Sequence, residues 1–149
     1  MKLDVRADEL RTLLEGASPA TLTLYGDDGE AITSPVWYRV ADDSFEVVVA
    51  ATDYKLDHLR QDPRCVLLIF EATPPFRGVT VRDQASMEFD ESAQVRLAIA
   101  TRYLGPDAGR AYADLDRRPP GWVVRLPVAA ARAWHLGDKL PDQRLIGQG

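Results

Sequence analysis

The sequence predicts a single domain, residues 1–149, with a mostly β fold of six or more antiparallel strands and peripheral helices. Short apolar or alternating segments recur along the chain, as strands of a sheet require. Turns rich in glycine and aspartate separate these segments. A short charged helix stands between the third and fourth strands, and no glycine-rich phosphate loop accompanies it. An antiparallel barrel is therefore favoured over a parallel nucleotide-binding fold.

The first half of the chain supplies an amphipathic helix, four strands and the short helix. Leucines recur at helical spacing over residues 6–15, and a glycine follows. Pro35 cannot donate a hydrogen bond to a neighbouring strand, so its strand is expected at an edge or a bulge. The short helix is expected to end near residue 61, before Pro63. The strands are expected over residues 20–25, 30–40, 44–51 and 64–70.

The second half predicts a long, half-solvated strand followed by two helices and two more strands. One face of residues 77–89 is apolar and the other is polar, as in an antiparallel sheet with one side in water. A polar tail is expected to close the chain. The later helices are expected over residues 95–104 and 108–115, the strands over 121–126 and 129–136, and the tail over 137–149.

Composition narrows the classes of protein. No apolar run approaches the roughly 20 residues that span a bilayer, and the N-terminus lacks a signal-peptide pattern. The net charge of −5 argues against binding to nucleic acid. Cys65, the only cysteine, is expected to be a buried thiol in a reducing compartment, and His58 and His135 have no neighbouring metal ligands. We therefore expect a cytoplasmic protein that contacts neither membrane nor nucleic acid, with no metal site.

The junction between the third strand and the short helix is the first candidate site. The strand ends on small residues and leads through Thr52 and Asp53 into Tyr54 and Lys55. Amide groups at a helix N-terminus attract anions, and a lysine in the first turn adds a positive charge. The residues favour a phosphate site, while the alternative is a solvated lysine on a helix surface.

Three segments carry a resemblance to a known family. The succession SPVWYRV, VVVAATDYKL and HLRQDPRCVLLIF resembles the pyridoxamine 5′-phosphate oxidase-like split β-barrel superfamily, whose members bind FMN or the deazaflavin coenzyme F-420. The resemblance is strongest over residues 20–89. Its most specific part is Lys55, followed by Asp62, Pro63, Arg64 and an apolar strand.

This resemblance implies a homodimer with cofactor sites between the protomers. It implies that the strand around Pro35 runs beside the cofactor ring and that the helix start holds the phosphate. His58 lies one turn after Lys55, where it either contacts phosphate or substrate or is a plain surface histidine. The implied cofactor-binding residues are Ser34, Pro35, Val36, Trp37, Ala51, Thr52, Asp53, Tyr54, Lys55 and His58.

Departures from the family pattern bear on the cofactor. Tyr54 and Ser34 stand where the FMN-dependent oxidases carry arginines, so the sequence looks more like the F-420-dependent branch. Arg39 fits where a substrate-phosphate lysine would stand. Three further residues are candidates for substrate or cross-dimer contacts, with a solvated charge or interface packing as the alternative: Arg77, Trp134 and Lys139.

The resemblance thus implies an oxidoreductase that uses F-420 or FMN to transfer hydride to or from a small organic substrate. The cofactor would carry the chemistry, and no constellation for nucleophilic catalysis is visible, so the catalytic residues are unknown. The alternative is a non-catalytic flavin-, deazaflavin- or tetrapyrrole-binding protein. A third, weaker hypothesis is a dimeric interaction domain with a closed cleft.

Overall fold

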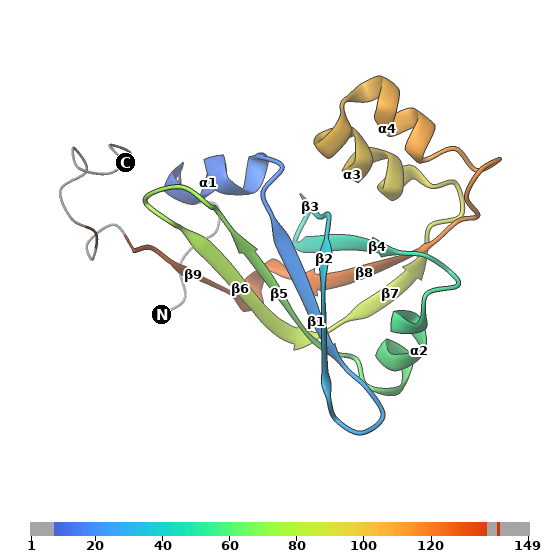
Figure 1. Cartoon of the computed structure of the whole chain (residues 1–149), viewed down its shortest axis with the longest axis horizontal. Coiled ribbons are helices and arrows are strands. Elements are labelled where there is room, and N and C mark those ends of the chain that lie inside the picture. The colour runs from blue at the N-terminus through green and yellow to red at the C-terminus, as the bar shows by residue number, and fades with distance from the viewer. Residues whose placement is uncertain (1–7, 137–139, 141–149) are drawn as a thin grey trace.

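Nine strands and four α-helices make up the part of the chain that the computed structural model describes, residues 8–136 and residue 140 (Figure 1). The strands are β1 (Ala20–Tyr25), β2 (Ala31–Val36), β3 (Arg39–Ala41), β4 (Ser44–Val49), β5 (Arg64–Phe70), β6 (Gly78–Gln84), β7 (Ser86–Phe89), β8 (Trp122–Pro127) and β9 (Ala131–Trp134). The helices are α1 (Asp8–Glu15), α2 (Tyr54–Gln61), α3 (Gln94–Leu104) and α4 (Pro106–Tyr112), with a 3-10 turn, η1, at Val128–Ala130.

The strands form two antiparallel sheets. The five-stranded sheet has the order β2-β1-β5-β6-β9, and the four-stranded sheet has the order β3-β4-β8-β7. The chain crosses between the sheets at Ala85, which separates β6 from β7, and at η1, which separates β8 from β9. The mostly antiparallel fold is confirmed, as is the edge position of Pro35, because β2 is an edge strand.

The two sheets do not close into a continuous barrel in the described residues. The strands predicted over residues 30–40 and 77–89 are each divided, into β2 and β3 and into β6 and β7. The two parts of each belong to different sheets. Pro35 has no backbone N–H to donate to a neighbouring strand. The chain leaves the five-stranded sheet directly after Val36 and enters the four-stranded sheet at β3. In the described residues, β2 and β3 are therefore not hydrogen-bonded to each other. The sheets consequently part at this edge.

The core lies between the inner faces of the two sheets. Alternating residues of the first sheet are fully buried, including Leu22, Leu24 and Ile69. From the second sheet, Phe45 and Val124 pack in the same apolar cluster. This alternation follows from the period of two along a strand, which turns every second side chain to one face.

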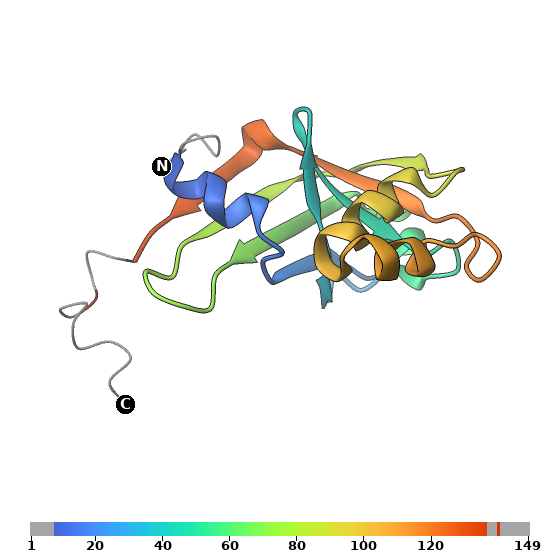
Figure 2. The same ribbon diagram turned by 90° about the horizontal axis from the view of Figure 1, so that it is seen from above.

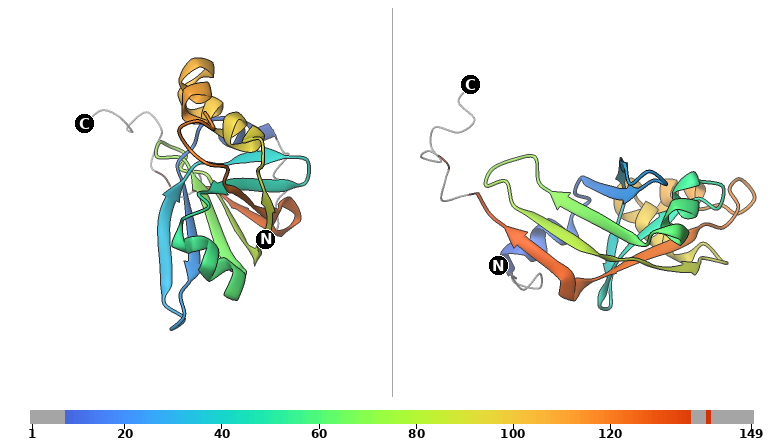
Figure 3. Two further views of the ribbon diagram at one scale, coloured as in Figure 1. Left: turned by 90° about the vertical axis from the view of Figure 1, so that its right-hand side faces the viewer. Right: turned by 90° about the horizontal axis from the view of Figure 1, so that it is seen from below.

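Helices cover the margins of the sheets. The leucines of α1 and of α2 are buried, as their helical spacing predicted. Helices α3 and α4 lie together on one side of β4, whereas α2 lies on the other, and α1 covers a separate end of the five-stranded sheet (Figures 2 and 3). Gly109 allows α4 to approach α3 closely, because a Cβ there would lie 2.8 Å from the Thr101 backbone.

Boundaries of the remaining elements agree closely with the predicted ones. The helix expected over residues 108–115 instead begins at Pro106 and ends at Tyr112, because proline suits the first turn of a helix. The predicted polar tail lies outside the described residues, apart from Leu140. Among the residues that are described, none of the helices has the length and apolar character needed to cross a bilayer.

Candidate functional site: a cleft between the two sheets

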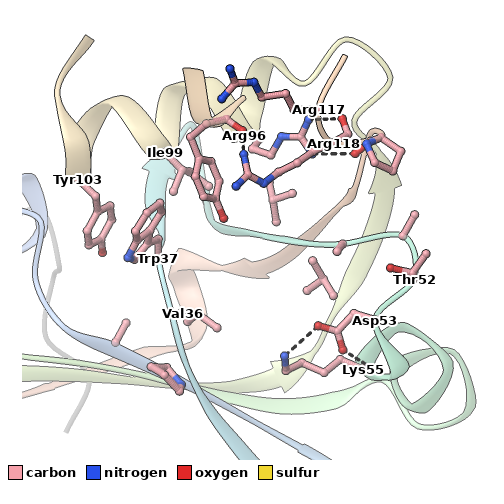
Figure 4. Close-up of a pocket in the computed structure, with 18 of the residues that line it drawn as sticks. Val36, Trp37, Thr52, Asp53, Lys55, Arg96, Ile99, Tyr103, Arg117 and Arg118 are labelled. Atoms are coloured by element: carbon pink, nitrogen blue, oxygen red, sulfur yellow. Dashed lines mark hydrogen bonds and ion pairs between the residues drawn. The ribbon is translucent and has the colours of Figure 1, made fainter. Parts of the chain in front are cut away.

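A cleft of about 800 Å³ opens where β2 and β4 separate, beneath α3 and α4 (Figure 4). Its lining comes from the ends of β1, β2 and β4, from the loop that leads into α2, and from the helical pair with the loop that follows it. The lining residues are Ala17, Pro19, Ala20, Pro35, Val36, Trp37, Val48, Val49, Ala50, Ala51, Thr52, Asp53, Lys55, Arg96, Ile99, Tyr103, Tyr112, Arg117, Arg118 and Pro119.

Three aromatic rings form an apolar platform on one side of the cleft. The ring of Trp37 stacks on that of Tyr103, with centroids 5.1 Å apart and planes 10° apart. The ring of Tyr112 is tilted against Trp37 at a centroid distance of 5.2 Å. The Tyr103 hydroxyl donates to the Ser18 carbonyl at 2.9 Å, which fixes that ring. Such a platform suits a flat, aromatic ligand.

Arg102 holds the segments around the aromatic platform together through hydrogen bonds. Arg102 donates hydrogen bonds to the Tyr38 carbonyl and to carbonyls at the end of α1, among them that of Gly16 at 2.9 Å. Its guanidinium also lies 5.2 Å from the Tyr38 ring centre. Arg102 therefore ties α1, α3 and the segment that carries Trp37 into one unit.

The start of α2 forms the first charged side of the cleft, called here the α2 wall: Thr52, Asp53 and Lys55. Asp53 caps the helix, because its Oδ1 accepts from the Lys55 backbone N–H at 2.9 Å. Its Oδ2 accepts from Lys55 Nζ at 3.0 Å, and Lys55 is only 17% exposed. The carboxylate of Asp53 thus partly neutralises both the helix start and the lysine.

The opposite side carries three arginines, called here the arginine wall: Arg96, Arg117 and Arg118. Arg96 is buried and donates to the carbonyls of Pro119 at 2.8 Å, Arg118 at 3.1 Å and Ala113 at 3.4 Å. Arg118 donates to the Tyr112 carbonyl at 2.9 Å, and its guanidinium lies 4.3 Å from the Tyr112 ring centre. Within the described residues, none of the three arginines has an ion pair with a carboxylate.

Most residues predicted from the family resemblance come together in this cleft. It is lined by seven of the ten predicted cofactor-binding residues: Pro35, Val36, Trp37, Ala51, Thr52, Asp53 and Lys55. The other three are not among its lining residues. Ser34 has a buried hydroxyl without a hydrogen-bond partner in the described chain, Tyr54 is 54% exposed, and His58 Nδ1 lies 3.7 Å from the Asp27 carboxylate.

The predicted substrate or cross-dimer residues lie elsewhere in the chain. Arg39 pairs with the buried Glu46 at 2.6 Å, and Arg77 pairs with Glu71 at the same distance. Trp134 packs against Gly78, where a Cβ would come within 2.0 Å of its ring. Lys139 lies outside the described residues. A contribution from these residues across a dimer stays a prediction.

The arginine wall and two of the three platform rings are missing from the sequence prediction. Helix α3 was predicted, but nothing in its periodicity indicates that Arg96 and Tyr103 face a cleft. The one signal that could have been used is the pair Arg117 and Arg118 before two prolines, which marks a basic loop between helix and strand.

Burial perturbs the ionisable groups near the platform. Desolvation raises the pKa of Tyr38 to about 12 and also raises the pKa of the Tyr103 hydroxyl. Both phenols stay protonated at neutral pH and act as hydrogen-bond donors rather than as bases. Among the described residues, no group of three or more His, Cys, Asp or Glu side chains could hold a metal ion.

Solved structures with the same architecture identify the fold. A conserved hypothetical protein, Rv2991, from Mycobacterium tuberculosis has 25% identity and a TM-score of 0.75, over 95% of this chain and 92% of that one. An F-420 reductase has 18% identity and a TM-score of 0.65, over 78% and 91%. A candidate pyridoxamine 5′-phosphate oxidase from Listeria innocua has 18% identity and a TM-score of 0.63, over 87% and 97%.

Other proteins with this fold bind different groups. They include a FAD-binding protein from Mesorhizobium loti and the haem storage protein HutZ from Vibrio cholerae, each 17% identical with TM-scores of 0.59 and 0.63. No protein-family model and no curated protein matches the sequence. The chain has the fold of the pyridoxamine 5′-phosphate oxidase-like superfamily, and the resemblance predicted from the sequence is confirmed.

Proposed function

We propose that this protein is a cytoplasmic, homodimeric oxidoreductase that binds coenzyme F-420 or FMN in the cleft and transfers hydride to or from a small organic substrate. The observation that carries the proposal is the cleft itself. It has an aromatic platform on one side, and cationic side chains at the α2 wall and at the arginine wall. An F-420 reductase and a FAD-binding protein with this fold support the choice of cofactor.

The residues of the cleft fit such a group. A volume of about 800 Å³ lies within the range of pockets that bind ligands of this size. In the described residues β2 is an edge strand, so the backbone groups along its outer edge have no neighbouring strand, and its end leads into Trp37 of the platform. We expect these groups to hold the ring and the α2 wall to hold the phosphate. The lining contains four cationic side chains and one carboxylate, which favours an anionic ligand in a chain of net charge −5.

The protein's own contribution is to orient the cofactor ring and to shield it from water. When bound, the flavin or deazaflavin ring supplies the hydride donor or acceptor. Trp37 limits the ring's orientation through its own stacking on Tyr103. Helices α3 and α4 supply one side of the cleft through Arg96, Ile99, Tyr103 and Tyr112, and would shield a bound ring from water on that side. The Tyr103 hydroxyl is already committed to the Ser18 carbonyl, so proton transfer would have to use another group or water.

Titration with FMN and with F-420, followed by Trp37 fluorescence, tests the proposal. We expect one of them to bind with a Kd below about 100 μM, equivalent to about 5.5 kcal/mol. A Trp37→Phe variant retains an aromatic ring and controls for the origin of the signal. If both cofactors fail to bind at that concentration, the proposal is wrong.

The alternative is a non-catalytic flavin-, deazaflavin- or tetrapyrrole-binding protein. It is favoured by the lining of the cleft: among the described residues that form it there is no histidine and no carboxylic acid other than the paired Asp53 to act in proton transfer. The fold of the haem storage protein HutZ gives it further support. Binding of a cofactor without hydride transfer to quinone or enone acceptors would favour this alternative.

A further inference from the structure

The arginine wall has an unbalanced charge. The side chain of Arg96 is buried, with the residue 8% exposed, yet its guanidinium contacts only backbone carbonyls. Its Nε has no hydrogen-bond partner in the described residues. The nearby Asp90 accepts from the backbone N–H of Arg96 at 3.0 Å rather than from the side chain. Buried charges in proteins are normally paired, whereas the guanidinium of Arg96 has no ion pair with a carboxylate in the described residues.

Arg118 is pre-arranged to supply hydrogen bonds to such a counter-charge. Its guanidinium lies over the Tyr112 ring, and within the described residues only one of its five N–H groups is used, by the Tyr112 carbonyl. The carbonyls of Pro119 and Arg118 are in turn held by Arg96, so the buried arginine fixes the loop that presents the exposed one. A stacked guanidinium with a free edge suits carboxylate and phosphate groups.

The α2 wall differs in this respect, because its lysine is already paired. Lys55 lies 3.0 Å from Asp53, so an incoming anion must compete with a carboxylate there. An anion at the arginine wall meets no such competitor in the described residues. The two walls lie on opposite sides of the same cleft (Figure 4).

We propose that the arginine wall is a second anion subsite, which binds a carboxylate or phosphate group, with Arg118 as the direct ligand and Arg96 as the positioning residue. This extends the proposed function by giving the substrate a chemical class, an organic acid or a phosphate ester. It rests on that function for the presence of a cofactor, but not for the binding of the anion itself.

The test observes the arginine side chains directly. The Nε–H groups of the full-length protein are followed by ¹H–¹⁵N NMR during titration with inorganic phosphate at constant ionic strength. We expect saturating shifts for Arg96 and Arg118 and only small, linear shifts for Arg132, which is exposed on β9 away from the cleft. Absence of saturating shifts for both Arg96 and Arg118 would overturn the subsite.

Two variants with the same change of charge provide the control. Arg118→Met should weaken phosphate binding at least tenfold, whereas Arg132→Met should leave it unchanged. Arg118→Lys keeps the charge but loses the planar fork, so intermediate binding is expected. Both arginines are exposed, so neither methionine should impair folding, and unfolding curves check this. Equal effects of Arg118→Met and Arg132→Met would contradict the proposal.

Titration of the same variants with FMN and F-420 distinguishes the source of the anion. If Arg118→Met weakens phosphate binding but not cofactor binding, the subsite belongs to a second molecule, the substrate. If both are weakened, it binds an anionic part of the cofactor. Phosphate binding without cofactor binding would refute the proposed function alone, and cofactor binding without phosphate binding would refute the subsite alone.

Discussion

The two charged walls of the cleft differ in how their positive charges are compensated. At the α2 wall, one aspartate caps the helix and pairs with Lys55 through its two oxygens. At the arginine wall, carbonyl dipoles of the loop are the partners of Arg96, and Arg118 lies against an aromatic ring. Both walls are cationic, but only the second has donors without a competing carboxylate in the described residues.

This difference shows that a cationic residue in a cleft is not by itself a measure of anion affinity. The α2 wall is built for a stable helix start, since Asp53 serves the backbone and the side chain of the same residue. At the arginine wall, the positive charge of Arg96 is buried. Burying this charge costs some stability, which a bound anion would offset. Changing one wall at a time separates the two roles.

Replacing Arg96 with methionine should have the largest effect on stability. Methionine fills a similar volume but leaves the carbonyls of Ala113, Arg118 and Pro119 without their donor. We expect a loss of about 3 kcal/mol in the free energy of unfolding, measured with denaturant. Arg110→Met, an exposed arginine on α4, should change it by less than about 0.5 kcal/mol. Similar losses in both variants would show that Arg96 does not hold the loop.

The packing of α4 against α3 is the next test of the arginine wall. In Gly109→Ala, the new Cβ would lie 2.8 Å from backbone atoms of Thr101, which cannot move aside easily. We expect a loss of about 1–2 kcal/mol despite the gain in helix propensity, together with weaker phosphate binding. Gly16→Ala is the matched control, because its nearest neighbour is 3.5 Å away. Thermal unfolding of both variants measures the difference.

Substitutions of Asp53 separate capping from pairing at the α2 wall. Asp53→Asn keeps an oxygen for the Lys55 N–H but removes the charge that holds Lys55 Nζ. Stability should change little, and affinity for FMN should rise about fivefold, equivalent to about 1 kcal/mol. Asp53→Ala also removes the cap and should lose about 1 kcal/mol of stability. If Asp53→Asn leaves FMN affinity unchanged, the phosphate does not bind at this wall.

Alkaline pH should affect the base of the platform and the core. Burial raises the pKa of Tyr38 from 10.0, and that of Cys65 from 9.0, in each case to about 12. The unfolded chain releases these protons first, so their stabilising effect is complete below pH 9 and is lost as the pH rises toward 12. Tyr38→Phe should therefore flatten the fall of stability in this window.

The expected change in Tyr38→Phe at neutral pH is the smallest of the series. The Tyr38 hydroxyl donates to the Leu14 carbonyl over a long 3.4 Å, so its loss should change stability by about 0.5 kcal/mol. Chemical denaturation at pH 7 and pH 10.5 measures both effects. A variant with the same pH dependence as the wild type would show that Tyr38 ionises normally in the folded protein.

The strands and helices could be predicted largely from local pattern. Alternating leucines in β1, the apolar run of β5 and the leucines of α2 depend on periodicity, which neighbouring residues alone determine. The division at Ala85 could not be predicted, because the apolar alternation of residues 77–89 keeps one phase on both sides of it. After Val36 the exposure pattern changes phase between β2 and β3, which residue types alone do not reveal. The antiparallel fold was therefore predicted correctly, but the assignment of the divided strands to two sheets was not.

The sequence by itself determined the antiparallel fold, the α2 wall and part of the aromatic platform, since Pro35, Trp37, Asp53 and Lys55 lie in two short segments with recognisable order. Only the tertiary structure decided that the arginine wall faces the cleft and that Lys55 of the α2 wall is paired with Asp53. Arg96 and Arg118 reach the cleft because α3 and α4 fold back over β4, a contact between residues far apart in the chain. The pairing of Lys55 with Asp53 likewise depends on side-chain geometry, which residue spacing does not specify.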